Sequence, residues 1–266
     1  MKKISLLGCG WLGLPLAKVL VQKGFQIKGS TTSPAKIDAL EKEKIIPFLM
    51  ELSTTKIEGD VATFLQDSEI LIIDIPPKLR QNLQENFVGK IQTLIPFIEK
   101  SSVSKVLFVS STSVYGKAQG LVTEDTPAFP DSEGGKQLLI VEKLLHDNAN
   151  FKTTVLRFGG LTGVDRNPVR FLAGKENLPN PQSPINFIHQ RDCIGIIEKI
   201  IATHSWDKTF NAVSPHHPTR QEYYQKKALE LGLQPPTFDA SSTEIGKTIS
   251  SDTIASVLNY TFVETP

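Results

Sequence analysis

The first part of the chain, residues 1–158, alternates short apolar runs with segments whose apolar residues repeat at helical spacing. The apolar runs are continuous, which is typical of strands buried on both faces. We expect six strands, at residues 4–7, 26–29, 46–50, 70–75, 106–109 and 154–158. Helices are expected between them, at residues 12–23, 34–43, 61–66, 81–99 and 135–146. This alternation predicts an α/β fold with a doubly wound parallel sheet and right-handed crossovers.

A glycine-rich turn follows the first predicted strand, where residues 8–13 read GCGWLG. In a G-x-G-x-x-G turn, Gly8 permits a tight bend, Gly10 lets a diphosphate approach the backbone and Gly13 lets the helix pack on the strand. Trp11 and Leu12 lie where the helix begins, and its free N–H groups attract phosphate there. We therefore predict a dinucleotide-binding Rossmann unit, with a purely structural tight turn as the alternative.

The pattern changes after residue 158. Prolines interrupt the chain at positions 168, 179, 181 and 184, and short elements replace the alternation. We interpret residues 1–158 as the dinucleotide-binding domain and residues 159–266 as a smaller, irregular substrate-binding lobe. One further helix, at residues 192–203, is expected to return to the sheet, with Asp192 as its N-cap.

The N-terminus allows a second interpretation. Met1, Lys2 and Lys3 are followed by an apolar segment and by Cys9, which resembles a lipoprotein cleavage box. The apolar segment covers only residues 4–7, whereas a secretory signal needs about 7–15 apolar residues. We therefore expect an uncleaved, cytoplasmic chain.

Charge and cysteine content exclude several classes of protein. The chain has 29 basic and 28 acidic side chains, a net charge of +1, which does not indicate a nucleic-acid partner or an anionic membrane. No apolar run approaches the roughly 20 residues that span a bilayer. Cys9 and Cys193 supply neither a disulfide framework nor a metal cluster, and His216 and His217 lack further ligands. We expect a small-molecule substrate and no metal.

The residues after the second predicted strand bear on the choice of dinucleotide. Sites selective for NAD usually place Asp or Glu there, about 20 residues after the glycines, to bind the ribose 2′-hydroxyl. This chain has no carboxylate at that position; instead it has Ser30, Thr31, Thr32 and, slightly later, Lys36. Hydroxyl groups and a cation suit a 2′-phosphate. The sequence therefore favours NADP over NAD, although a Ser/Thr turn capping the next helix would look the same.

Three further segments resemble the short-chain dehydrogenase/reductase superfamily, in its extended NAD-dependent epimerase/dehydratase branch. Residues 109–116 read VSSTSVYG, residues 156–163 read LRFGGLTG, and residues 186–192 read NFIHQRD. Their order and spacing, together with the glycine turn, cover most of the chain. The resemblance implies a Rossmann fold, a nicotinamide cofactor and the possibility of a homodimer.

The resemblance also locates the reaction centre, where this chain is atypical. The family's substrate-polarising serine corresponds to Ser111, although a serine at a strand end also satisfies backbone groups. The family's catalytic Tyr-x-x-x-Lys pair shares one helix face, so that lysine and cofactor can lower the pKa of the tyrosine. Here Gly134 and Leu138 occupy these two positions. Lys136 points about 200° away from Gly134 on a helix of 3.6 residues per turn, and Tyr115 follows the strand too closely, so neither is a good replacement.

Other cofactor contacts follow from the same resemblance. Ile75, Pro76 and Pro77 follow the fourth predicted strand, where ligands approach an open α/β sheet. Glu51 and Leu52, just past the third strand, correspond to the family's adenine-edge position, which usually holds Asp and an apolar residue. We expect all five to contact the cofactor.

The substrate side departs further from the family. Members that bind sugar nucleotides carry Asn and Arg at the positions that Gly160 and Ile185 occupy here. Two groups that hold the nucleotide are therefore missing, which argues against a sugar-nucleotide substrate. Arg166 and Arg170 are candidates for attracting an anionic substrate, with a solvated surface as the alternative.

We interpret the chain as an NAD(P)-binding oxidoreductase or epimerase-like protein that acts on a carbonyl or hydroxyl carbon of a small metabolite. The alternative is a non-catalytic sensor or scaffold protein that binds NADP without turnover, which the missing tyrosine and lysine favour.

Overall fold

A parallel sheet of seven strands forms the centre of the computed structural model, which describes residues 2–77, 79, 84–117 and 120–265. The strand order is β12-β9-β7-β6-β1-β2-β3, and every neighbouring pair runs in the same direction. The strands of this sheet are β1 (Lys3–Leu7), β2 (Gln26–Thr31), β3 (Ile46–Leu49), β6 (Ile70–Ile73), β7 (Lys105–Ser111), β9 (Lys152–Phe158) and β12 (Thr209–Ala212). The predicted doubly wound Rossmann sheet is confirmed.

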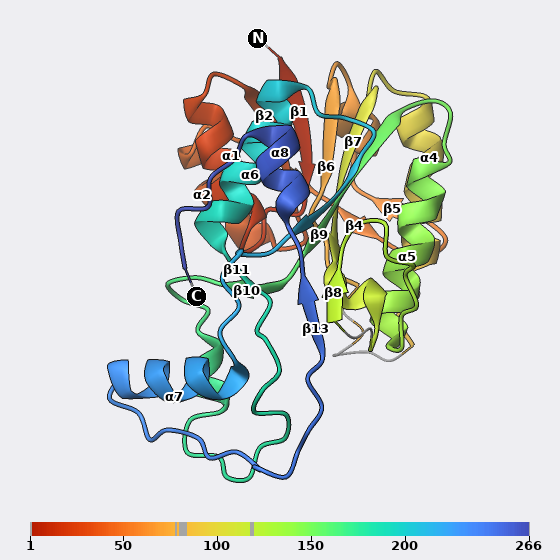
Figure 1. Ribbon diagram of the computed structural model, residues 1–266. Helices are drawn as coiled ribbons and strands as arrows, with labels where there is room; N and C mark the ends of the chain where they lie inside the picture. Colours follow the sequence, from red (N-terminus) through yellow and green to blue (C-terminus); the bar gives the residue numbers. More distant parts are fainter. Residues whose placement is uncertain (1, 78, 80–83, 118–119, 266) are drawn as a thin grey trace.

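Two helical layers cover the sheet (Figure 1). One layer contains α1 (Gly13–Gln22), α2 (Ile37–Lys42), α6 (Gln190–Thr203) and α8 (Asp252–Leu258). The other contains α3 (Val61–Leu65), α4 (Phe87–Glu99) and α5 (Glu133–His146). Side chains from one strand serve both layers, since Leu6 belongs to the first core and Leu7 to the second. Burial on both faces explains why the strands appear in the sequence as continuous apolar runs.

The strand order of the sheet reverses at the first strand, β1. β1 pairs with β2 on one side and with β6 on the other, so the chain builds outward from it in both directions. In open α/β sheets, ligands bind at the carboxyl ends of the strands beside such a point. Those ends face the lower lobe in Figure 1.

Helix boundaries differ from the prediction by a few residues. The segment expected as one helix at 34–43 divides into a 3₁₀ turn, η1 (Pro34–Lys36), and α2. α4 begins at Phe87, where the Asn86 side chain accepts a hydrogen bond from the N–H of Gly89. Of the residues expected to precede it, 81–83 lie outside the described part of the chain.

The second part of the chain contributes more to the sheet than its sequence indicated. Helix α6 returns as expected, but β12 and α8 also pack on the Rossmann unit. The division at residue 158 therefore does not coincide with the edge of the sheet. The small elements of this second part are β10 (Gly160–Thr162), which pairs with β11 (Phe187–His189), η3 (Pro168–Phe171), α7 (Arg220–Glu230) and β13 (Lys247–Ile249). β13 pairs with β8 (Gly120–Val122), which comes from the first part of the chain.

A small lobe that contains α7 and η3 lies next to the carboxyl ends of the strands, at the bottom of Figure 1. Its own small core is built on Phe187, Tyr223 and Tyr224, whose rings meet edge to face. The remaining short elements are β4 (Glu51–Leu52) and β5 (Ile57–Glu58), which form a hairpin after β3, and the 3₁₀ turn η2 (Thr112–Tyr115) after β7.

Candidate active site

The glycine turn after β1 leaves no room for larger residues at two of its three glycines. Gly8 has a φ of +106°, and a Cβ there would lie 2.4 Å from the carbonyl oxygen of Asp74. A Cβ on Gly13 would lie 2.1 Å from the carbonyl oxygen of Gly8. Both contacts are with backbone, which cannot move aside cheaply. Tight turning and close helix–strand packing therefore require these glycines, as the motif predicted.

Gly10 differs from the other two, because nothing in the described part of the chain crowds it. A Cβ built on Gly10 has no described atom within 4 Å, and the residue is exposed. Its glycine is thus not required by the fold itself. Open space over the backbone at the start of α1 is what a bound diphosphate needs.

Ser30, at the end of β2, holds the glycine turn in place. Its hydroxyl accepts a hydrogen bond from the N–H of Gly8 at 2.9 Å, and its carbonyl oxygen accepts one from the N–H of Cys9 at 2.7 Å. The side chain is 3% exposed. The Ser30 hydroxyl uses its acceptor side to hold the turn and keeps its proton, but the buried side chain offers little surface to a 2′-phosphate.

A cavity of about 310 Å³ opens beside the turn, at the carboxyl ends of β1, β2 and β6. Ten predicted site residues line it: Gly8, Gly10, Ser30, Thr31, Thr32, Lys36, Glu51, Leu52, Ile75 and Pro76. Five others do not: Trp11, Leu12, Gly13, Pro77 and Ser111. Six further residues line the cavity but were not predicted as cofactor contacts: Leu7, Cys9, Met50, Asp74, Phe87 and Lys90.

Of the added residues, Phe87 and Lys90 belong to the first turn of α4. Neither residue was predicted to line the site, because the helix was expected to start at residue 81, so that both fell in its interior. Lys90 carries a charge into the same cavity as Lys36 and Glu51 and pairs with Glu85 at 2.5 Å. Asp74 had a recognisable signal, a carboxylate directly after a central strand.

Asp74 lies at the end of β6, against the glycine turn. Its carboxylate accepts a hydrogen bond from the N–H of Gly13, which favours the ionised form, but burial outweighs this bond and raises the pKa of Asp74 to about 8. The neighbouring Cys9 is a buried thiol whose pKa is raised to about 12, first by burial and then by the nearby Asp74. Cys9 is therefore a small buried side chain that fills the turn.

Trp11 joins the turn to the segment that follows β10. Its indole Nε1 donates to Oδ1 of Asp165 at 2.7 Å, and the guanidinium of Arg166 stacks over its ring at 5.0 Å. The Nε2 of Gln190, at the start of α6, donates to the backbone oxygen of Trp11 at 2.7 Å. Arg166, a candidate for attracting an anionic substrate, is thus placed beside the cofactor turn.

Ser111 ends β7, and its hydroxyl accepts a hydrogen bond from the N–H of Ser113 at 3.1 Å. The bond caps η2 and supports the structural interpretation of this serine. The hydroxyl proton is not used in that bond, and the side chain is only partly buried. Ser111 therefore remains able to donate to a substrate oxygen.

The positions of the missing tyrosine and lysine lie on α5, as expected. Ser132 caps this helix by accepting from the N–H of Gly135 at 3.1 Å. Gly134 is partly exposed, Leu138 is buried with 5% exposure and Lys136 points to solvent. No side chain on this face replaces the Tyr–Lys pair.

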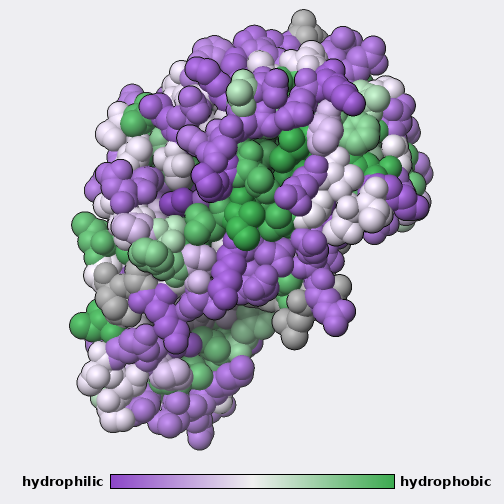
Figure 2. Space-filling model, turned by 90° about the vertical axis from the view of Figure 1, so that its right-hand side faces the viewer, coloured by the Kyte–Doolittle hydropathy of each residue, from purple (hydrophilic) through white to green (hydrophobic). Residues whose placement is uncertain are grey.

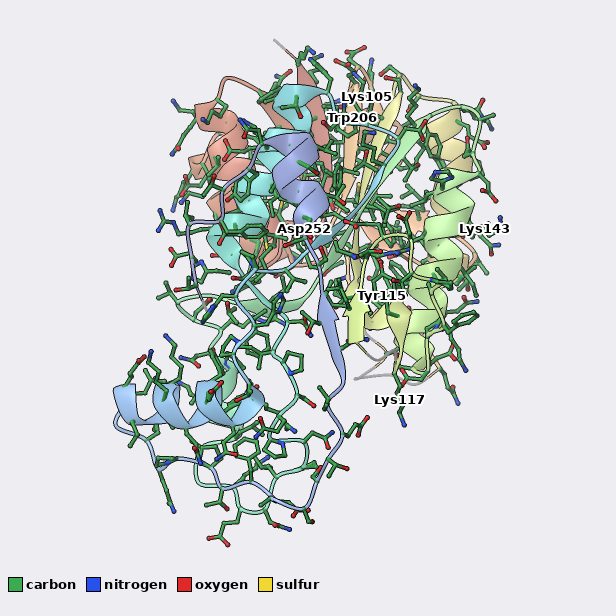
Figure 3. The ribbon with its side chains drawn as sticks, in the orientation of Figure 1. Lys105, Tyr115, Lys117, Lys143, Trp206 and Asp252 are labelled. Atoms are coloured by element: carbon green, nitrogen blue, oxygen red, sulfur yellow. The ribbon has the colours of Figure 1, made fainter. Side chains whose placement is uncertain are left out.

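Tyr115 is excluded as a replacement acid, because its hydroxyl is fixed in the interior (Figure 3). The side chain is 1% exposed and its hydroxyl donates to Oδ1 of Asn211 at 2.8 Å while accepting from Arg157 at 2.7 Å. Arg157 also binds Glu142, at 2.6 Å, and Glu142 accepts from Ser110 at 2.5 Å. Burial raises the pKa of Tyr115 in spite of the adjacent Arg157. This network holds α5, β7, β9 and β12 together.

The lobe lacks the two nucleotide-holding groups at the positions identified from the sequence. A Cβ on Gly160 would lie 2.5 Å from the ring of Phe187, so this position has no room for an asparagine. Ile185 is buried in the small core of the lobe. These packing contacts explain both departures from the family.

Asp192 is not the N-cap of its helix, contrary to the prediction. α6 begins two residues earlier, and His189 caps it by accepting from the N–H of Arg191 at 3.2 Å. Asp192 is fully buried and accepts from the hydroxyl of Tyr260 and the N–H of Val263, both at 2.8 Å. Its carboxylate therefore anchors the end of the chain to the Rossmann unit.

Ser33 is likewise not a side-chain cap for the turn after β2. No side-chain hydrogen bond caps η1, and the Thr31 hydroxyl instead accepts from the N–H of Ser33 at 3.1 Å. Thr32 and Lys36 remain exposed beside the cavity.

Within residues 2–77, 79, 84–117 and 120–265, no group of three or more His, Cys, Asp or Glu side chains is arranged to hold a metal ion. No helix there combines the length and apolar character needed to cross a bilayer. A second cavity, of about 600 Å³, lies among Phe25, Lys105 and Tyr260, at the amino ends of the strands and away from the glycine turn.

No family model matches the chain, but a curated relative does. It is 33% identical over 264 residues to the Escherichia coli protein YeeZ, covering 98% of this chain and 96% of that protein. The chain belongs to the YeeZ family.

Two solved epimerases share the fold over nearly the whole chain. The UDP-N-acetylglucosamine 4-epimerase of Bacillus cereus superposes with a TM-score of 0.81 at 16% identity, covering 98% of this chain and 94% of that one. The UDP-glucuronic acid 4-epimerase of Bacillus cereus, solved in complex with NAD, gives 0.79 at 18% identity, with 100% and 94% covered. At these identities the likeness concerns the fold.

Proposed function

We propose that the protein binds a nicotinamide dinucleotide at the glycine turn and uses it to oxidise, reduce or epimerise a carbonyl or hydroxyl carbon of a small metabolite. The observation that carries the proposal is the open backbone at Gly10, next to two glycines that the fold requires. The cavity beside the turn continues to Glu51 and Ile75. The likeness in fold to a 4-epimerase that was solved in complex with NAD supports the same assignment.

Between the two dinucleotides, we propose NAD. The hydroxyl groups after β2 favoured NADP, but the Ser30 side chain lies under the glycine turn and is 3% exposed, so it offers little surface to a 2′-phosphate. Glu51 lines the same cavity as Lys36 and Lys90, so the charge there is not purely positive. A similar fold has been solved with NAD. Titration of the protein with NADH and NADPH tests the choice, and tighter binding of NADPH would overturn it.

In the proposed reaction the cofactor supplies or accepts the hydride. Ser111 donates its hydroxyl proton in a hydrogen bond to the substrate oxygen, because its acceptor side is used by Ser113. Neither Gly134 nor Leu138 offers a proton to exchange, so water or the substrate itself completes the proton transfer. The residues of this chain thus bind and orient, and contribute less acid–base chemistry than the usual Tyr–Lys pair.

We infer that the substrate is not a sugar nucleotide. Phe187 fills the space at Gly160, and Ile185 is part of an apolar core. Neither position leaves a polar group to hold a nucleotide. Oxidation of NADH, measured against a panel of small carbonyl compounds, tests for activity, with Ser111→Ala as the matched control. Turnover that survives this substitution unchanged would remove Ser111 from the mechanism.

The missing pair on α5 favours a second candidate, a non-catalytic protein that senses NAD or uses it to dock a partner. Leu138 is buried where lysine would stand, and Gly134 has no side chain. The same panel separates the two functions. Tight NADH binding without turnover of any carbonyl or hydroxyl compound would support the sensor and contradict the enzyme.

We also propose a homodimer that pairs α4 and α5 of two copies. Figure 2 shows apolar side chains gathered on the face that carries these helices. Phe97 on α4 is 39% exposed and Ile140 on α5 is 48% exposed. Sedimentation of the wild type and of Ile140→Glu tests the assembly. A wild type that stays monomeric at micromolar concentration would contradict it.

A further inference from the structure

Asp74 places a carboxyl group inside the turn that is proposed to hold the diphosphate. Its backbone N–H donates to the carbonyl oxygen of Leu7 at 2.9 Å, continuing the pairing of β6 with β1. A Cβ on Gly13 would lie 3.0 Å from its Oδ2, and the carboxylate accepts the Gly13 N–H. The side chain therefore lies against the first residue of α1, and it cannot move far.

α1 depends on this contact at its start. The residue that precedes the helix, Leu12, provides no side-chain cap. Asp74 supplies the missing acceptor from the neighbouring strand, and its negative charge is favourable at the positive end of the helix. The cavity lining includes Asp74 together with Gly8 and Gly10, so the same carboxyl group also borders the space for the cofactor.

A diphosphate brought to this space carries two negative charges. The carboxylate of an ionised Asp74 already interacts with the positive N-terminal end of α1. Its negative charge also repels the phosphate groups across the glycine turn. A protonated Asp74 keeps one oxygen to accept the Gly13 N–H and adds no charge. The two protonation states therefore differ in their affinity for the ligand, which is the condition for linked binding.

Other charged and titratable groups surround the site. Lys36 faces the cavity from the segment after β2, Glu51 from β4 and Lys90 from α4. The thiols of Cys9, in the turn, and Cys193, on α6, also lie close enough to interact with Asp74, and burial raises the pKa of both. Among the described residues of the lining there is no histidine.

We propose that the dinucleotide binds the form of the protein in which Asp74 is protonated, so that binding above neutral pH takes up one proton at this residue. The inference rests on the proposed cofactor binding. It makes Asp74 a positioning residue that sets the upper pH limit for a loaded site, in addition to capping α1.

The size of the effect follows from the position of the titration. Because burial raises the pKa of Asp74 to about 8 in the free protein, the dissociation constant should be constant below about pH 7. Above pH 8 it should rise about tenfold for each pH unit, until the pKa of the complex is reached. Between pH 7 and pH 9 we expect roughly tenfold weaker binding.

Calorimetric titration with NAD from pH 6.5 to 9.5 tests the inference. At pH 9, titrations in two buffers of different ionisation heat count the protons taken up, and we expect close to one. Asp74→Asn, which keeps the shape but cannot titrate, should bind NAD with no dependence on pH over this range. Glu51→Gln removes another carboxylate of the same cavity; because Glu51 is itself a proposed cofactor contact, its affinity is expected to change, but the slope against pH should match that of the wild type.

The outcomes separate this inference from the function on which it rests. Binding of NAD that is independent of pH, without proton uptake, overturns the inference alone, as does an Asp74→Asn protein that keeps the slope. Failure of NAD to bind at any pH overturns the proposed function as well. If Asp74→Asn does not fold, the proton count of the wild type decides.

Discussion

The indole Nε1 of Trp11 donates a hydrogen bond to Oδ1 of Asp165 at 2.7 Å, across 154 residues of sequence. Trp11 belongs to the glycine turn, and Asp165 belongs to the segment that leads from β10 into the lobe. A Cβ on Gly163 would lie 2.8 Å from the same indole ring. The turn that is proposed to hold the cofactor is thus joined directly to the part of the chain expected to hold the substrate.

This contact makes Trp11 an intrinsic probe of binding. The ring is partly exposed at the turn, whereas the other tryptophan, Trp206, is buried near Lys105 at the opposite end of the sheet (Figure 3). We expect NAD to change the tryptophan emission of the wild type and of Trp206→Phe. Trp11→Phe should lose the change. An unaltered response in Trp11→Phe would place the cofactor elsewhere.

The interior network around Arg157 predicts a cost in stability without a cost in binding. Tyr115→Phe leaves Arg157 and the buried Asn211 without a partner at that point, and should lower the free energy of unfolding by about 1–3 kcal/mol. Glu142→Gln removes the charge that balances the buried Arg157, and should cost about 3–5 kcal/mol. Urea denaturation measures both.

Tyr115→Phe also serves as a test of the reaction centre. Its affinity for NAD should equal that of the wild type at a temperature where both are folded, because the hydroxyl faces Asn211 and Arg157. A loss of turnover in a folded Tyr115→Phe protein would contradict the structural role given to this tyrosine.

The raised pKa of Asp74 predicts how stability changes with pH in the absence of ligand. An acid whose pKa is higher in the folded state binds its proton more tightly there. The stabilisation of the folded state by the proton on Asp74 is therefore complete below about pH 4 and is lost as the pH rises to about 8. The wild type should therefore lose about 2.7 kcal/mol of unfolding free energy from pH 6 to pH 9, relative to Asp74→Asn. If the unfolding free energy from urea denaturation depends on pH in the same way for both proteins, the predicted loss of stability is contradicted.

Much of the fold follows from the sequence because its strongest signals are local. Continuous apolar runs fixed all six expected strands to within a few residues, since burial on both faces leaves no polar alternation. The glycines were predicted for the right reasons, because turn geometry needs only neighbouring residues. The seventh strand, β12, was missed, since its four residues follow an irregular segment.

The parts of the site that were missed depend on contacts between distant segments. Nothing near Trp11 in the sequence indicates Asp165, and nothing near Asp192 indicates that its carboxylate binds the chain at Val263. Ser30 was predicted as a cofactor ligand, and the sequence did not indicate that its hydroxyl also accepts from the N–H of Gly8. The chemical type of each side chain could be recognised from the sequence, whereas the distant group to which it hydrogen-bonds could not.

Calorimetric titration of NAD into the wild type and into Gly10→Ala is the most direct test of the central claim. Gly10 has open space over it in the folded protein, so Gly10→Ala should fold with a melting temperature close to that of the wild type. The added methyl group would occupy the space proposed for the diphosphate, and NAD binding should weaken at least tenfold. Equal NAD affinity in the two proteins, or no heat of binding in the wild type, would contradict the account.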